Sequence, residues 1–198
     1  MILKTATPEQ LRRVYERDLR ASFPPDELRP LPVMERLCQA GRYRPWCAFD
    51  EGGGVLGVLF LNLGNPGWAL GDYLCVSQER RNGGLGARIL REVRKKEPGL
   101  VILGEAEDPA GAPDPAMAER RLGFYRRNGA RFASFRSEVF GARYRLLYFS
   151  DAPVAEDRLL WEYDGIYRRD FSREKYERFV RIPWTPAMPP MPKVAWDQ

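Results

Sequence analysis

Hydrophobic residues recur along this chain with a spacing that changes from segment to segment. Thr7 and Pro8 predict the start of a helix, because threonine caps free amides and proline suits the first turn. The apolar positions that follow recur at the interval of one helix face: Leu11, Val14, Tyr15 and Leu19. Prolines in residues 23–31 end this pattern, and residues 32–39 predict a second helix before Gly41.

From residue 44 onward the pattern becomes that of strands. Three apolar runs are separated by short turn sequences, and they occupy residues 44–50, 55–63 and 68–76. Runs joined in this way predict an antiparallel meander. Residues 100–107 are apolar at nearly every position, which is typical of a buried strand.

The remaining segments predict a mixed sheet flanked by helices. Expected helices occupy residues 85–97, 117–128 and 159–171, and expected strands occupy residues 131–135 and 143–149. A strand, a crossover helix and a second buried strand form a parallel pair, whereas the other strands are joined by turns. The prediction is therefore an α/β fold with a mixed, mostly antiparallel central sheet. Residues 182–198 are too rich in proline to predict regular structure.

Three glycines stand in four positions just before one of these helices, in QERRNGGLGARIL at residues 78–90. Glycine lets backbone amides converge on one ligand, and the helix N-terminus that follows favours an anion. The spacing matches neither a P-loop nor the dinucleotide fingerprint, because Gly86 is not followed by Lys and Ile89 replaces the third glycine. What remains is R-x-x-G-x-G at Arg81, Gly84 and Gly86, which indicates a phosphate site. A tight turn that binds nothing is the alternative.

The composition limits the kinds of metal site and catalytic base that this chain can form. The chain has 198 residues, which favours one main domain, and it contains three cysteines and no histidine. Without imidazole, ordinary zinc and haem sites and a histidine base are disfavoured, so we expect no metal. The cysteines stand at apolar positions without C-x-x-C spacing and are interpreted as core residues.

No signal peptide and no membrane-spanning run are visible, so we expect a cytoplasmic protein with no membrane partner.

Two segments carry a resemblance to a known family. YLCVSQERRNGGLGARIL, residues 73–90, resembles the coenzyme A motif of the GNAT superfamily of acyl-CoA N-acyltransferases. RLGFYRRNGARF, residues 121–132, resembles the second signature of these enzymes. The resemblance implies a CoA-binding catalytic domain in residues 1–150. Residues 151–198 carry no signature, and we expect them to add a helix and a proline-rich tail packed on the same domain.

The resemblance implies acetyl-CoA, or another acyl-CoA, as the cofactor. The loop amides would hold its pyrophosphate. In such enzymes the strand before the loop splays from the strand after it, so that the pantetheine arm pairs with exposed backbone. The residues implied in cofactor binding are Leu74, Val76, Gln78, Arg81, Asn82, Gly83, Gly84, Leu85, Gly86 and Ala87.

Two residues are the expected catalytic groups. The superfamily places a tyrosine that acts as an acid on the helix of the second signature, and Tyr125 is the matching residue. A phenol with a pKa of about 10 can protonate a leaving thiolate, because the pKa of the thiol is about 8.5. Glu105 ends the strand after the glycine loop, where superfamily members often place a carboxylate, and is the expected base. Glu107 is its alternative, because sequence does not fix strand register. Glu27 is a further hypothesis, and core packing is the alternative role for Tyr125.

The implied reaction moves an acetyl or other short acyl group to a primary amine of a small molecule or peptide, by direct attack in a ternary complex. The sequence leaves the acceptor open. Carboxylates at Asp26, Glu27, Glu105, Glu107 and Asp108 favour a cationic amine, whereas Arg29, Arg42 and Arg44 favour an acid-bearing substrate. Tyr15, Tyr163 and Tyr167 either line a pocket or pack in the core.

Other readings stay open. A protein with this fold and a CoA site but without transfer would act as a regulator or scaffold. Nucleic-acid binding rests only on a net charge of +5 and is least favoured, because basic residues are interspersed with acidic ones. The tail with Trp184 and Trp196 either docks across the domain, docks on a partner in a homodimer, or is a flexible end.

Overall fold

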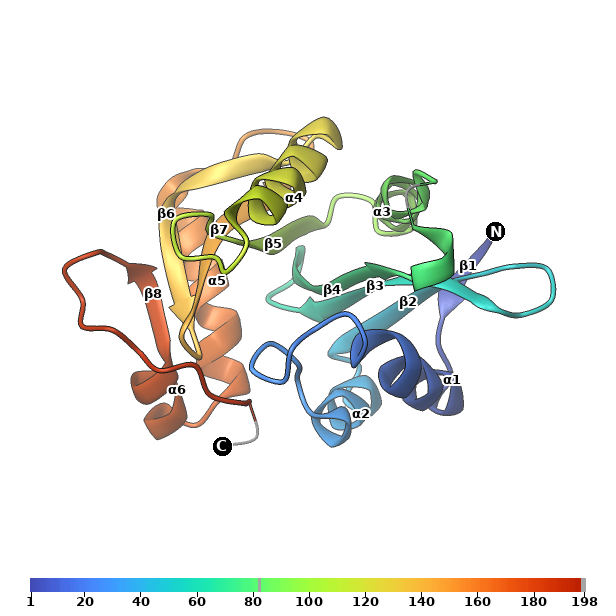
Figure 1. Ribbon diagram of the computed structural model, residues 1–198, viewed down its shortest axis with the longest axis horizontal. Helices are drawn as coiled ribbons and strands as arrows, with labels where there is room; N and C mark the ends of the chain where they lie inside the picture. Colours follow the sequence, from blue (N-terminus) through green and yellow to red (C-terminus); the bar gives the residue numbers. More distant parts are fainter. Residues whose placement is uncertain (82, 197–198) are drawn as a thin grey trace.

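A computed structural model of the chain describes residues 1–81 and 83–196, and its centre is an eight-stranded sheet (Figure 1). The strands are β1 (Ile2–Thr5), β2 (Tyr43–Phe49), β3 (Val55–Leu63), β4 (Trp68–Val76), β5 (Val101–Glu107), β6 (Arg131–Val139), β7 (Ala142–Phe149) and β8 (Val180–Trp184). Their order in space is β1-β2-β3-β4-β5-β7-β6-β8, and all described neighbours are antiparallel except β4 and β5. The predicted mixed sheet with one parallel pair is confirmed.

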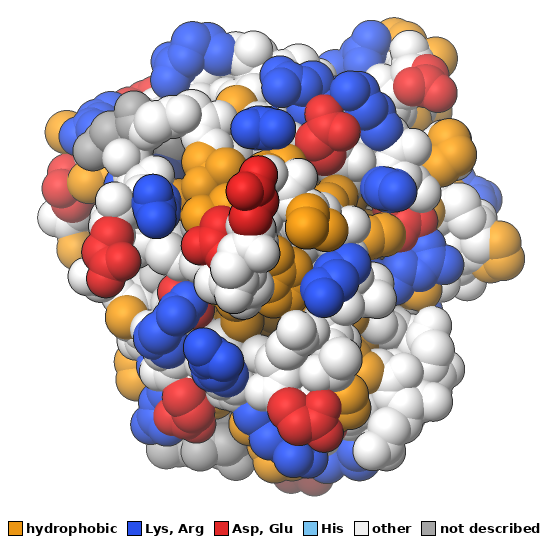
Figure 2. Space-filling model, turned by 90° about the vertical axis from the view of Figure 1, so that its right-hand side faces the viewer, with side chains coloured by type: hydrophobic (Ala, Val, Ile, Leu, Met, Phe, Trp, Pro, Cys, Tyr) orange, Lys and Arg blue, Asp and Glu red, His pale blue; other side chains and the backbone are white. Residues whose placement is uncertain are grey.

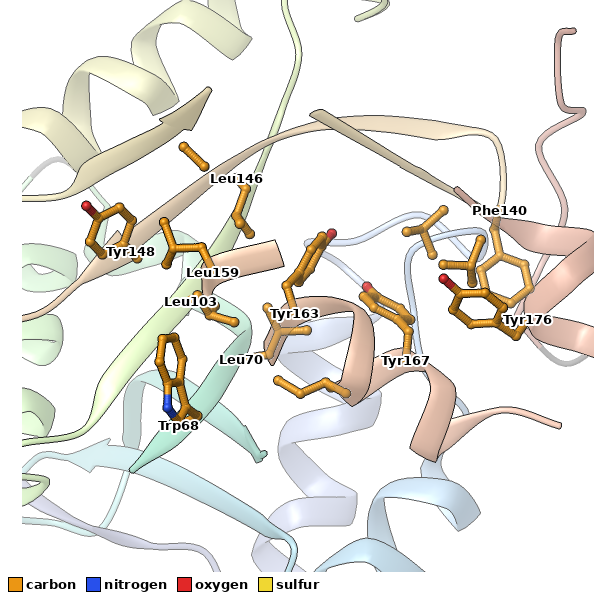
Figure 3. Close-up of a cluster of buried hydrophobic side chains, with 14 of the residues drawn as sticks. Trp68, Leu70, Leu103, Phe140, Leu146, Tyr148, Leu159, Tyr163, Tyr167 and Tyr176 are labelled. Carbon is orange, nitrogen blue, oxygen red and sulfur yellow. The ribbon is translucent and has the colours of Figure 1, made fainter. Parts of the chain in front are cut away.

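Helices cover both faces of this sheet. They are α1 (Pro8–Val14), α2 (Leu31–Gln39), α3 (Leu85–Lys96), α4 (Pro115–Arg127), α5 (Glu156–Asp170) and α6 (Arg173–Phe179), with a π-helical turn η1 (Tyr15–Leu19) and a 3₁₀ turn η2 (Gln78–Arg80). In the view of Figure 1, α3 and α4 lie above the sheet and α1 and α2 below it. The α5 helix packs its buried face against β4, β5 and β7, as Figure 3 shows for Tyr163 and Tyr167.

Three elements differ from the sequence prediction. The β1 strand is short and mostly exposed, so it has no apolar alternation by which it could be recognised. The α6 helix has seven residues and was likewise not predicted. The expectation of no regular structure after residue 182 is wrong for β8, which pairs with β6 at the edge of the sheet. An edge strand tolerates Pro183, because the missing N–H can lie on the side without a neighbour.

The parallel pair separates after only four residues. It runs from Trp68 opposite Val101 to Gly71 opposite Gly104, and the rest of β4 has no partner in β5. The β3–β4 register shifts at the same level, which leaves Asp72 as an extra residue in β4. A bulge of this kind bends a strand and increases its twist. We therefore attribute the separation of β4 from β5 to the bulge at Asp72.

The connection between η1 and α2, residues 20–30, is called the elbow here, and a buried arginine fixes it to the sheet. Arg29 is 2% exposed; its Nε lies 3.0 Å from Asp72 Oδ2 and its Nη1 lies 3.2 Å from Asp170 Oδ2. The Arg29 backbone N–H also donates to the Tyr73 hydroxyl, which in turn donates to the Glu27 carbonyl. The elbow, the bulge of β4 and the end of α5 therefore meet at one guanidinium.

The proline-rich tail lies against the same region. Trp196 is buried, stacks on Phe140 with ring centroids 5.1 Å apart, and lies 4.8 Å from the Arg29 guanidinium. Lys193 lies 3.7 Å from Asp26 of the elbow. Residues 191–196 therefore dock on this chain itself, as Figure 1 shows for the dark red segment beside the elbow.

We expect Asp170→Ala to reduce the free energy of unfolding by about 3–5 kcal/mol, because it leaves the buried charge of Arg29 with one partner fewer. Glu177→Ala removes a carboxylate from an exposed pair with Arg173 and should cost less than about 1 kcal/mol. Urea unfolding of both variants measures the difference. Equal losses would contradict a structural role for the buried pair.

Candidate active site

The glycine loop ends in an uncapped helix. Gly84 has φ +71° and precedes α3 directly, and no side chain caps that helix. The amides of the first helical turn, from Leu85 to Ala87, therefore have no intrahelical partner. A β-carbon at Gly84 would meet no heavy atom within 4 Å, so the space beside Gly84 is open. A β-carbon at Gly86 would lie 3.6 Å from Phe124 of α4 and from Val76 of β4, which is ordinary van der Waals contact.

The other predicted cofactor residues lie around this loop. Gln78 belongs to the exposed 3₁₀ turn η2, and Gly83 is exposed. Arg81 is also exposed, but its guanidinium is bonded to the protein: Nε donates to the Val76 carbonyl at 3.3 Å and Nη2 to Ser22 Oγ at 3.2 Å. This arginine links the end of β4 to the elbow. Asn82 lies outside the described residues.

The end of β4 beyond the bulge presents a free edge. Leu74 and Val76 are partly buried, and their side chains pack on the face of the sheet that α3 and α4 cover. The edge of this segment toward β5 lacks a ladder partner there, because the β4–β5 pairing stops at Gly71. An unpaired strand edge that leads to a set of free helix amides fits an extended ligand that ends in phosphate groups.

Glu105 stands where β4 and β5 separate. It is partly exposed, and its Oε1 accepts hydrogen bonds from Tyr163 and, at 2.7 Å, from Tyr167. Burial raises the pKa of Glu105 to about 7, although both hydroxyl bonds act in the opposite direction. A carboxyl group with a pKa near neutrality can both accept and release a proton under ordinary conditions.

Further carboxylates act on one another and on Glu105. Burial raises the pKa of Glu27 in the elbow, and the charges of Glu107 and Asp26 raise it further. Glu107 also lies 3.4 Å from Arg121. These carboxylates are the part of the predicted acidic mouth that the structure brings together. Asp108 does not belong to it, because it is buried and paired with Arg136 at 2.9 Å.

The arginines named as candidates for an acidic substrate all pair with carboxylates of this chain. Arg29 and Arg42 both pair with Asp170, and Arg44 pairs with Glu97. The buried Arg29 is therefore not available to an acid-bearing acceptor, whereas Arg42 and Arg44 are partly exposed. Figure 2 shows one face of the molecule on which basic and acidic side chains are intermixed.

Tyr125 lies on the face of the sheet opposite Glu105. It lies on α4 and packs against Phe124 and Phe149, with ring centroids 5.2 and 6.5 Å away. Burial raises the pKa of Tyr125. Its neighbours include Ala106, whose side chain must point away from that of Glu105 because successive residues of a strand alternate in direction. Glu105 and Tyr125 therefore belong to different faces of the same sheet.

Two residues that hold Glu105 were not predicted in that role. Tyr163 and Tyr167 were expected either to line a pocket or to pack in the core, and both are buried in it. Their spacing of four residues on a helix is the signal that could have paired them. Their common partner on β5 could not be found in this way, because the two contacts join residues 58 and 62 positions apart in sequence.

Comparison with known proteins depends on structure alone. No protein-family model and no curated protein matches the sequence. Solved structures do match. A putative acetyltransferase of the GNAT family from Bacteroides thetaiotaomicron has a TM-score of 0.65 at 19% identity, over 82% of this chain and 94% of that one. This chain has the GNAT acyltransferase fold. The resemblance inferred from the two motifs is confirmed at the level of the fold.

Two further GNAT-fold structures were solved with coenzyme A. An aminoglycoside 6'-N-acetyltransferase complexed with coenzyme A has a TM-score of 0.59 at 14% identity, over 78% of this chain and 99% of its own. Spermidine N-acetyltransferase from Vibrio cholerae, in complex with CoA and spermine, has a TM-score of 0.57 at 9% identity, over 75% and 94%.

No helix in residues 1–81 and 83–196 of this GNAT fold is long and apolar enough to cross a membrane. In the same ranges, no group of three or more histidine, cysteine, aspartate or glutamate residues is arranged to hold a metal ion.

Glu105→Gln should stabilise the protein increasingly as pH rises. The folded-state pKa of about 7 lies above the ordinary value of 4.5, so protonation of Glu105 favours folding at low pH and this contribution is lost as pH rises through 7. The difference in Tm between variant and wild type should therefore grow between about pH 4.5 and about pH 7 and stay constant at higher pH. Glu51→Gln in an exposed turn is the control. A difference that stays constant with pH would contradict the raised pKa.

Proposed function

We propose that the protein is an acyl-CoA-dependent N-acyltransferase, which moves an acetyl or other short acyl group to a primary amine of a small molecule or peptide in a ternary complex. The observation that carries the proposal is Glu105, a carboxyl group with a pKa of about 7 at the point where β4 and β5 separate. The GNAT fold and the coenzyme A complexes of two neighbours support it.

The chain's own backbone would hold the acyl donor. Amides of the first turn of α3 and of Gly83 and Gly84 would bind the pyrophosphate, and the free edge of β4 at Leu74 and Val76 would pair with the pantetheine arm. When bound, acyl-CoA supplies a thioester whose carbonyl carbon accepts an amine nucleophile. Arg81 would act indirectly, by fixing the loop to the end of β4 and to the elbow.

Glu105 would act as the base. An alkylammonium with a pKa of about 10.4 must lose a proton before its nitrogen can attack. Above pH 7 Glu105 is mostly a carboxylate, and it is accessible enough to take that proton. The carboxylates of Glu27 and Glu107 favour an acceptor that carries positive charge. A spermine complex of one structural neighbour is consistent with such an amine.

Tyr125 would act as the acid for the departing thiolate. Its raised pKa keeps the phenol protonated at neutral pH, so it has a proton to give. Because Tyr125 lies on the face opposite Glu105, Glu105 would accept the amine proton on one side of the sheet. Tyr125 would donate its own proton to the thiolate from the other side. The two groups therefore do not compete for one position.

Glu105→Gln and Tyr125→Phe should each lower kcat by about 10²- to 10⁴-fold while acetyl-CoA affinity stays nearly constant. Release of CoA thiol with a panel of primary amines measures the rate, and calorimetry measures affinity. The wild-type kcat/KM should rise with pH through about 7, and this inflection should be absent in Glu105→Gln. CoA binding without transfer to any amine would indicate a binding module instead.

Gly84→Val should weaken acetyl-CoA binding roughly tenfold or more, through loss of hydrogen bonds to the phosphates. Gly99→Val is a matched control, because Gly99 has φ +74°, equally open surroundings and a place at the other end of α3. Both variants bear the same left-handed strain, so their stabilities should fall alike. Equal affinities in calorimetric titration would remove the pyrophosphate assignment.

A further inference from the structure

Two tyrosines of one helix converge on a single oxygen atom. Tyr163 and Tyr167 are 0% and 1% exposed, lie one turn apart on α5, and both donate to Glu105 Oε1. Their rings are nearly perpendicular, with centroids 5.5 Å apart, and Figure 3 shows them side by side on the helix. Two hydroxyl donors on one oxygen fix the plane of the carboxyl group and not only its distance.

Contacts other than those with Glu105 hold the two tyrosines in place. The Tyr163 hydroxyl lies 2.8 Å from Ser137 Oγ of β6. A phenol has one proton, so while Tyr163 donates to Glu105 the serine donates to Tyr163. One turn beyond Tyr167, Asp170 fixes the end of α5 through its pair with Arg29. The position of both donors is therefore set from β6 and from the elbow.

The other carboxylate oxygen has a different environment. Oε2 of Glu105 makes no hydrogen bond to any residue in the described ranges 1–81 and 83–196, and Glu105 is partly exposed. Because both buried tyrosines occupy Oε1, the oxygen that can meet a ligand is Oε2.

The groups that face Glu105 act on it in opposite directions. Asp72 of β4 and Glu27 of the elbow carry negative charge that disfavours the carboxylate, as does burial. Tyr144 of β7 is a further titratable neighbour, and its pKa is raised by burial and by both Glu27 and Glu105. Only Tyr163 and Tyr167 favour the carboxylate among the described causes. Loss of either hydroxyl should make the proton harder to remove.

We propose that Tyr163 and Tyr167 are positioning residues that fix the Glu105 carboxylate through Oε1 and direct Oε2 toward the acceptor amine. The inference rests on the proposed function. Oε2 takes one proton from the ammonium, and the neutral nitrogen then forms the bond to the acyl carbon. The carbon–sulfur bond breaks, the leaving thiolate takes the proton of Tyr125, and the second proton of the nitrogen restores the phenol through solvent. Oε1 accepts both hydroxyl bonds before and after the transfer, so neither tyrosine has to move.

The test measures the titration of Glu105 directly. Carbon-13 NMR of glutamate labelled at the side-chain carboxyl follows the group, and Glu105→Gln identifies its resonance. Tyr167→Phe should raise the titration midpoint by roughly one pH unit, the effect of one lost hydrogen bond to a charged group. Tyr163→Phe should do the same and is the second variant, should one of them fold poorly. Tyr176→Phe is the matched control, because that hydroxyl bonds to Asp164 instead.

The same variants are compared in acyl transfer. A shift of that size lowers kcat/KM about fivefold at pH 7 and less than about twofold at pH 9, whereas a merely structural loss lowers it at every pH. Unshifted titration in both variants overturns the proposal. Shifted titration with an unshifted rate profile overturns the assignment of Oε2 to proton transfer. Shifted titration in a protein that transfers to no amine supports the positioning of Glu105 and refutes the proposed function.

Discussion

The buried guanidinium of Arg29 is the contact on which the arrangement of the site depends. Burial lowers its pKa, and Asp72 and Asp170 raise it by more, so the side chain stays charged. A buried charge that lost a partner would cost several kcal/mol, so the elbow, the bulge of β4 and the end of α5 must meet there. The same helix carries Tyr163 and Tyr167 to Glu105. The ion pair of Asp170 with Arg29 fixes the end of α5, one turn beyond the tyrosine that donates to Glu105, and in this way contributes to the orientation of the Glu105 carboxyl group.

The separation of β4 from β5 leaves backbone groups without strand partners, and a bound ligand can offset the free energy that this costs. Backbone groups at a separated strand edge need other partners, and water or an extended ligand can supply them. The bulge at Asp72 lies in the strand that leads to the uncapped N-terminus of α3, so the free edge and the free amides belong to successive segments of the chain. Glu105 and Tyr125 lie on opposite faces of the sheet. In the proposed reaction, β4 and β5 would therefore lie between the base and the acid.

A chain without histidine obtains a group that titrates near neutrality by partly burying a carboxyl group. Burial and the neighbouring carboxylates Asp72 and Glu27 raise the pKa of Glu105, and two hydroxyl donors limit the rise. A pKa left at its ordinary value would make a weaker base, and one raised much further would keep the group protonated at pH 7. The folded state is less stable above pH 7 for the same reason, which is a common consequence of tuning a group for chemistry.

The sequence by itself determined which long segments have the hydrophobic spacing of a helix or of a strand, and where glycines mark the turns. It also contains two motifs similar enough to those of a known family to predict the fold. Those features are local, and hydrophobic spacing reports them directly. It also named Glu105 and Tyr125, as matches to positions in that family. Only the tertiary structure decided that Asp108 pairs with Arg136. It also decided that the candidate arginines Arg29, Arg42 and Arg44 form ion pairs within the chain. Finally, it decided that Tyr163 and Tyr167 donate to the same oxygen of Glu105. Each of these outcomes depends on which side chains meet across the sheet, and a one-dimensional pattern carries no information about such distant partners.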